Sequence, residues 1–167
     1  GFDAKGIHIL QRALRGLGDV FVCAPKSEQS ASSHSLTVRQ KITTYRVAEG
    51  RYKVAGTPTD CVLLGIQGIL GRKPDLLVSG INHGPNMGED VTYSGAVAAA
   101  MEGTLLGVPS LAFSSLQRTI RSDELVERVA AHYHANRAAA EQALAAMPGG
   151  PHGLYQADLA EPAAAQS

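Results

Sequence analysis

The pattern of hydrophobic and polar positions predicts alternating helices and strands along most of the chain. Apolar residues recur at helical spacing between residues 7 and 17, which predicts an amphipathic helix that ends at the glycines of 16–18. The apolar run at 19–24 then predicts a buried strand, closed by Pro25. Because a helix that leads into a parallel strand normally follows an earlier strand, the pattern implies one more strand, which is missing from this sequence.

Two further strands are predicted at residues 36–47 and 51–55, joined by a turn at 48–50. A helix should follow, because Thr57 is a good N-cap, a proline occupies the first helical position, and Asp60 is an acid in the first turn. We interpret Asp60 as a helix cap. The same helix should end at Gly71.

The stretch from residue 73 to residue 103 reads as strand, polar loop and helix. The strand is predicted at 75–78, and the loop at 80–90 holds three glycines, two asparagines, two acids and a proline. In open α/β sheets, ligands bind where strand ends meet helix N-termini. The N–H groups of Ser94, Gly95 and Ala96, at the start of an alanine-rich helix, would suit an anion such as phosphate. An ordinary connection between strand and helix is the alternative.

Other segments complete the picture of a single domain. Residues 25–35 contain five serines, and they are either a flexible polar loop or, because they follow a strand, part of a site. A strand is predicted at 110–113 and a long helix at 122–147. Residues 148–167 are rich in Pro, Gly and Ala and predict a loose tail. We therefore expect a domain at 1–147 with a three-layer α/β fold and a mostly parallel sheet.

Composition narrows the function. The 167 residues are 44% hydrophobic with zero net charge, which does not favour nucleic acid or an acidic membrane surface as a partner. No apolar run approaches the ~20 residues of a membrane helix, and no signal peptide is recognised. We expect a cytoplasmic protein in which Cys23 and Cys61 are free thiols, with a disulfide as the alternative.

Four stretches, in this order, carry a resemblance to a known family. They are GFDAKGIHIL at 1–10, APKSEQSASSHSLT at 24–37, GTPTDCVLLG at 56–65, and the motifs SGIN, GPN, GED and YSG within 74–103. Together they resemble the SurE (survival protein E) family of metal-dependent nucleotidases and phosphatases, over roughly residues 1–115. The resemblance implies a Rossmann-like fold and hydrolysis of nucleoside 5′- and 3′-monophosphates to nucleoside and phosphate.

The resemblance also implies a site. The family binds one divalent cation, Mg²⁺ or Mn²⁺, through two adjacent aspartates, a loop serine and an asparagine. By motif position the last two are Ser30 and Asn82. Asn86, Ser94 and Gly95 match residues around the phosphate, so Asn86 and Ser94 are the catalytic candidates. Ser94 is expected to bind phosphate and not to act as a covalent nucleophile.

The chain departs from the family in three ways. The aspartate pair would stand immediately before Gly1, outside this chain, so metal binding should be weak. Ala31 and Ala96 stand where the family usually has glycine and often has threonine, and Ala31 would be strained if its φ is positive. Beyond about Leu116 no match is expected, so the chain is either truncated at both ends or altered after Ser115. In its full-length form the family is expected to be a homodimer or a higher homo-oligomer.

Several alternatives stay open. His34 and His83 are proton shuttles or solvated loop residues; Asn82 is a ligand or a left-handed turn residue. Tyr93 stacks on a nucleobase or packs in the core, and Glu89 and Asp90 orient ligands from outside the metal site. A catalytically dead phosphate-binding or interaction module is the alternative to an enzyme. A dinucleotide-binding module is disfavoured, because the glycine spacing does not fit G-x-G-x-x-G.

Overall fold

The computed structural model describes residues 1–115, 131 and 154–158, and in these residues the strands form two three-stranded sheets. In the first sheet, β1 (Val22–Pro25) pairs in parallel with β3 (Arg51–Val54), and β2 (Thr44–Ala48) runs antiparallel to β3. The second sheet has the order β4 (Leu77–His83), β5 (Ser110–Ser115) and β6 (Leu154–Asp158), all parallel. The sheets are therefore mostly parallel, as predicted.

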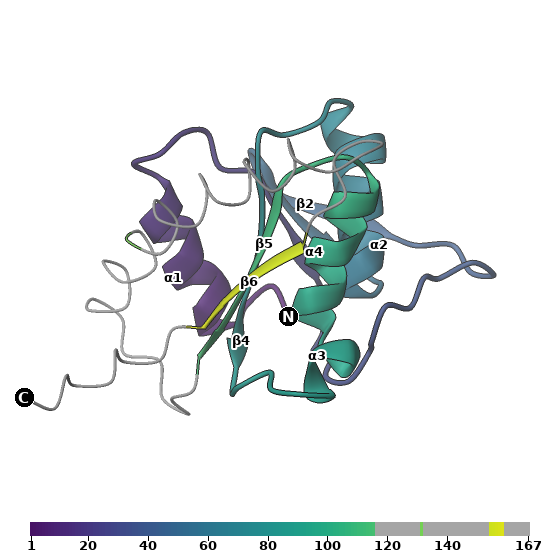
Figure 1. Ribbon diagram of the computed structural model, residues 1–167. Coiled ribbons are helices and arrows are strands. Elements are labelled where there is room, and N and C mark those ends of the chain that lie inside the picture. Colours follow the sequence, from purple (N-terminus) through teal and green to yellow (C-terminus); the bar gives the residue numbers. More distant parts are fainter. Residues whose placement is uncertain (116–130, 132–153, 159–167) are drawn as a thin grey trace, which may run out of the picture.

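Helices cover both faces of the second sheet (Figure 1). Helix α1 (Lys5–Leu14) packs on one face, where Leu111 and Phe113 of β5 point toward it. Helix α4 (Gly95–Leu105) packs on the other face against Ala112, because alternate residues of a strand point to opposite sides. The predicted three-layer α/β fold is confirmed.

A second helix packs beside α4. This helix, α2 (Pro58–Leu63), continues into the π-helical segment η1 (Leu64–Leu70), and apolar residues of both pack against α4. The Thr57 hydroxyl accepts a bond from the Asp60 N–H, while the Asp60 carboxylate accepts one from the Thr57 N–H, which is a capping box. Gly71, at φ 66°, ends the segment in a left-handed conformation. The predicted start and end of this helix are both confirmed.

Three strands have boundaries that differ from those predicted from the hydrophobic pattern. Strand β4 continues past the predicted end at residue 78, because a bulge at Gly80 (φ 116°) lets its pairing with β5 resume at Asn82. The predicted loop is accordingly shorter, and a short helix, α3 (Asp90–Tyr93), follows it. Strands β1 and β2 occupy only the last parts of their predicted ranges, and β1 extends to include Pro25.

The expectation of a loose tail is wrong for residues 154–158. These residues form β6, which pairs with β5 in the register Ser110↔Leu154. Composition could not reveal this strand, because its stability comes from the edge of the completely buried β5. The expected helix at 122–147 lies outside the described residues except for Ala131, which is helical. Within the part of the chain that the structure describes, no helix is both long and apolar enough to cross a membrane.

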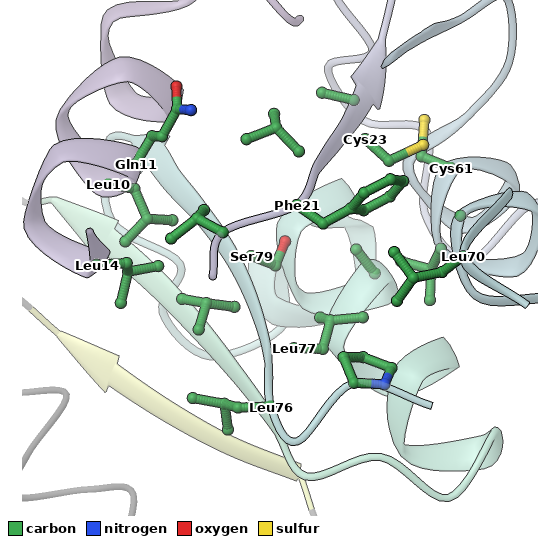
Figure 2. Close-up of a pocket in the computed structure, with 18 of the residues that line it drawn as sticks. Leu10, Gln11, Leu14, Phe21, Cys23, Cys61, Leu70, Leu76, Leu77 and Ser79 are labelled. Atoms are coloured by element: carbon green, nitrogen blue, oxygen red, sulfur yellow. The ribbon is translucent and has the colours of Figure 1, made fainter. Parts of the chain in front are cut away.

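A cavity of about 710 Å³ separates the two sheets (Figure 2). Its walls are β1, β4, α1 and α2, and they are mainly apolar, with Leu10, Leu14, Phe21, Leu76 and Leu77 among the lining residues. Strands β1 and β4 are each an edge strand of their sheet among the described residues. Both carboxyl ends lie near the start of α1, since the Phe2 N–H donates to Pro25 O at 2.7 Å and Gly6 packs against the Ile81 backbone.

Candidate functional site

The serine loop, residues 26–35, follows the carboxyl end of β1 and meets α3, the short helix that follows the loop after β4. The Ser33 N–H donates to Tyr93 O at 3.2 Å, and the Ser33 hydroxyl donates to Thr92 O at 2.9 Å. Both acceptors belong to α3, directly before α4. The serine loop is thus tied to the segment that leads into α4, so it is not a free polar loop.

The N-terminus of α4 differs in one detail from the anion site expected there. Ser94 caps the helix, as its hydroxyl accepts a bond from the Val97 N–H at 3.4 Å. Its own N–H donates to Val91 O at 3.4 Å, so the expectation that this N–H is open to an anion is wrong. Among the described residues the N–H groups of Gly95 and Ala96 have no acceptor. These two N–H groups are the ones that can bind an anion.

Sequence reasoning missed Ser32 as a site residue. The Ser32 hydroxyl is buried and has no hydrogen-bond partner in the described part of the protein. It lies beside Gly95, where an added Cβ would come within 2.9 Å of it and within 2.9 Å of Pro58 Cγ. A buried hydroxyl without a partner is costly unless a ligand satisfies it. The only signal in the sequence is the serine richness of the loop, which does not single out Ser32.

Asn82 and Asn86 form a polar chain at the ends of β4 and β5. The Asn82 amide nitrogen donates to Gly84 O at 3.1 Å and to Asn86 Oδ1 at 3.5 Å, and Asn86 Nδ2 donates to the buried Ser114 hydroxyl. Because both bonds of Asn82 use its nitrogen, its Oδ1 is left available for a cation. The positive-φ residues described do not include Asn82, so its interpretation as a left-handed turn residue is wrong.

Ser30 lies on the exposed part of the serine loop. Its hydroxyl donates to Glu28 Oε1 at 2.8 Å and makes no hydrogen bond to Asn82. Glu28, which sequence reasoning did not consider, therefore brings a carboxylate beside Ser30. The described residues contain no group of three or more His, Cys, Asp or Glu side chains placed to hold a metal. The oxygens present suit a hard cation in kind, but they supply little charge.

Ala31 adopts a left-handed conformation with φ 56°, which is the condition under which strain was expected at this position. An alanine pays about 1 kcal/mol in this region, which glycine does not. We therefore expect Ala31→Gly to raise the free energy of unfolding by ~0.5–1 kcal/mol, measured by urea denaturation. Ala98→Gly, in the interior of α4, is the control and should lower it. A loss of stability in Ala31→Gly would contradict the strain.

Asp60 is confirmed as a helix cap, and it also has a second role that the sequence did not reveal. Its carboxylate accepts bonds from the Thr37 N–H at 2.9 Å and from the Thr37 hydroxyl at 2.7 Å, and it is 1% exposed. Burial acts to raise its pKa, but the hydrogen bonds from Thr37 and Thr57 together outweigh burial and hold the pKa below its ordinary value. Asp60 thus fixes the end of the serine loop to α2.

The remaining candidate residues differ in burial and in their contacts. His34 Nε2 lies 2.8 Å from Glu102 Oε2, and its side chain is 28% exposed, so His34 is a partly buried residue that ties the serine loop to α4 and not a fully solvated one. His83 is exposed at the end of β4, and Glu89 and Asp90 are exposed near α3. Tyr93 is 59% exposed, so the interpretation of Tyr93 as a core residue is wrong.

Comparisons with known proteins agree with this geometry. A family model described as survival protein SurE matches residues 1–159. A 5′-nucleotidase SurE of Gemmatimonas aurantiaca is 53% identical over 127 residues, which cover 76% of this chain and 50% of that protein. A 5′-nucleotidase SurE of Paramagnetospirillum magneticum is 59% identical over 116 residues, 68% of this chain and 45% of that protein.

A solved structure is also similar to this chain. The SurE protein from Aquifex aeolicus matches with a TM-score of 0.77 and 45% identity over 81% of this chain and 56% of that chain. The chain spans about half the length of the curated relatives it matches. The match of the family model to residue 159 also corrects the expectation that the resemblance ends near Leu116.

Proposed function

The chain belongs to the survival protein SurE family, and from that premise we propose that it forms the phosphate-binding part of a nucleotidase. The reaction is hydrolysis of nucleoside 5′-monophosphates, and also of 3′-monophosphates, to nucleoside and phosphate. The observation that carries the proposal is the pairing of the open N–H groups of Gly95 and Ala96 with the unpartnered hydroxyl of Ser32. The names of the relatives, 5′-nucleotidase SurE, support this substrate class.

In this proposal the phosphate sits at the N-terminus of α4. The Gly95 and Ala96 N–H groups and the Ser32 hydroxyl donate to its oxygens, and the positive end of the helix dipole favours its charge. Ser94 holds these donors in place as the N-cap, and Asn86 contributes as a further phosphate-binding candidate. These donors are fixed before substrate binds, so they can also stabilise the charge that develops on the phosphate oxygens during hydrolysis.

The nucleoside would extend away from the phosphate toward Tyr93. Tyr93 directly precedes Ser94, and its ring is exposed. The backbone carbonyl of Tyr93 accepts the hydrogen bond from the Ser33 N–H of the serine loop. An aromatic ring can stack on any base, because every base has a π face. We therefore propose Tyr93 as the contact that distinguishes a nucleotide from a simple phosphate ester.

A divalent cation, Mg²⁺ or Mn²⁺, is proposed as the cofactor. Asn82 Oδ1 and Ser30 Oγ would hold it, with Asn86 orienting the Asn82 amide. Such an ion, once bound, lowers the pKa of a water ligand and offsets phosphate charge. Two neutral oxygens fit the ion but bind it weakly, since hard cations need carboxylates. A further pair of carboxylates at this edge of the sheet would complete the set.

Release of phosphate from a nucleoside 5′-monophosphate in the presence of Mn²⁺, with and without a chelator, tests the proposal. We expect weak turnover that the chelator abolishes. Asn82→Ala should weaken Mn²⁺ binding about tenfold or more, or ~1.4 kcal/mol, because it removes the available amide oxygen. Asn82→Asp, the matched variant, keeps an oxygen and should bind Mn²⁺ at least as well. Unchanged Mn²⁺ binding in Asn82→Ala would contradict the assignment of Asn82.

The neutral character of the two ligands also supports a second candidate function, a phosphate-binding module without catalysis. In that case the chain binds nucleoside monophosphate with the affinity set by α4 and Ser32, and no chelator-sensitive turnover is seen. Calorimetric titration with nucleoside monophosphate, run beside the phosphate-release assay, separates the two functions. Binding without release favours the module, whereas chelator-sensitive release favours the enzyme.

A further inference from the structure

Two thiols that the proposed site does not use meet at the wall of the cavity between the sheets. Cys23 lies in β1 and Cys61 in α2, and both line the cavity, with their sulfur atoms next to each other (Figure 2). The two side chains are close enough for each thiol to shift the pKa of the other. Cys23 is half-buried, whereas Cys61 is buried. Neighbouring thiols on two packed elements need little backbone movement to become bonded.

The backbone around the pair is closely packed. Gly65, in η1, lies so near to Cys23 that an added Cβ would come within 3.3 Å of Cys23 Cβ. A larger residue at this position would push the helix away from β1. Glycine here therefore lets the helix that carries Cys61 approach the strand that carries Cys23, and the contact between the thiols is a consequence of how these two elements pack.

The two thiols differ in chemical character. Cys23 is the more exposed of the two thiols, so an oxidant reaches its sulfur first. The neighbouring Cys61 thiol lowers the pKa of Cys23 more than burial raises it, and the Cys23 neighbour and burial both raise the pKa of Cys61. Exposure and the lowered pKa both make Cys23 the nucleophile, because the thiolate is the reactive form of cysteine.

We propose that Cys23 and Cys61 form an oxidative modification site, in which a peroxide converts the two thiols to a disulfide that joins β1 to α2. The Cys23 sulfur attacks one peroxide oxygen, an S–O bond forms as the O–O bond breaks, and the departing hydroxide takes up the proton that the Cys23 thiol loses and becomes water. The Cys61 sulfur then attacks the Cys23 sulfur, and the second hydroxide leaves with the Cys61 proton. Two thiols are oxidised and hydrogen peroxide is reduced to two waters.

Cys23 is only half-buried, and the position of the pair gives its oxidation a consequence. The segment between the two cysteines contains the whole serine loop and the β2–β3 hairpin. A disulfide would close this segment into a loop and restrict its unfolded conformations. Oxidation should therefore raise Tm and slow the exchange of the amide protons of the serine loop.

The test is treatment of the chain with hydrogen peroxide in slight excess, followed by intact mass and peptide mapping without reductant. The expected product is a monomer lighter by two hydrogen atoms, with a single crosslink between the peptides of Cys23 and Cys61, reversed by dithiothreitol. Cys61→Ser should leave a sulfenic acid on Cys23 that dimedone traps. In the matched variant Cys23→Ser, Cys61 should stay reduced.

Three results would overturn the proposal. They are two thiols that stay reduced, a Cys23 that proceeds to sulfinic acid without the crosslink, and crosslinks that form only between molecules. The mapping uses the unmodified chain, so its result stands even if a serine variant fails to fold. It also requires no catalytic activity, and therefore a failed crosslink and a failed nucleotidase assay are separate outcomes.

Discussion

An apolar strand that ends in two aspartates, fused directly before Gly1, should raise the hydrolysis of nucleoside monophosphates by about a hundredfold or more. The expected position of this strand is the cavity between β1 and β4, whose edges are without a strand partner among the described residues. Strand addition to both edges would join the two sheets into one. The cavity walls are apolar, so the strand should also raise Tm.

The position of the two carboxylates follows from the first residues of the chain. The Phe2 N–H is bonded to Pro25 O at the carboxyl end of β1, and Gly6 packs against Ile81, directly before Asn82. A strand that ends at Gly1 would therefore bring its last side chains to the edge of the sheet where Asn82 Oδ1 is available. Carboxylates there supply the charge that a divalent cation needs and that neutral oxygens lack.

The matched control is the same strand ending in two asparagines. Both fusions should fill the cavity and raise Tm equally, but only the aspartate fusion should gain Mn²⁺ binding and turnover. Phosphate release and Mn²⁺ titration measure this difference directly. Equal turnover in both fusions and in the unmodified chain would show that the proposed account of the metal site is incorrect.

Asp60→Ala should lower the free energy of unfolding by about 3 kcal/mol, because it removes a buried carboxylate and leaves three partly buried donors without an acceptor. The Thr37 N–H, the Thr37 hydroxyl and the Thr57 N–H all donate to this carboxylate, at 2.7–2.9 Å. Urea denaturation measures the effect, and Asp75→Ala, at an exposed position, is the control that should change it little. A loss in Asp60→Ala no larger than that in the control would contradict the role given to Asp60.

The pH dependence gives a second test of Asp60. Since its pKa in the folded protein is lowered, its contribution to stability is complete at neutral pH and is lost as the pH falls below the ordinary carboxyl pKa and through the lower folded value. The free energy of unfolding of the unmodified chain should therefore fall more steeply in acid than that of Asp60→Ala. Identical slopes in the two proteins would mean that the Asp60 carboxylate is not held by these bonds.

Local signals in the sequence were sufficient for much of the fold. Thr57, Pro58 and Asp60 predicted the start of α2 correctly, because a capping box uses only neighbouring residues. The helical spacing before residue 17 predicted α1, and alternating apolar segments predicted helices on both faces of mostly parallel strands. The order of four motifs identified the family.

The detail of the site was decided by contacts between residues far apart in sequence. Spacing could not show that the buried Ser32 hydroxyl lacks a partner, that Ser94 uses its N–H within the preceding turn, or that His34 pairs with Glu102. It also could not predict β6, since that strand depends on the edge of β5. Local sequence therefore determined the elements and their caps, while long-range hydrogen bonding and packing determined which polar groups remain open to a ligand.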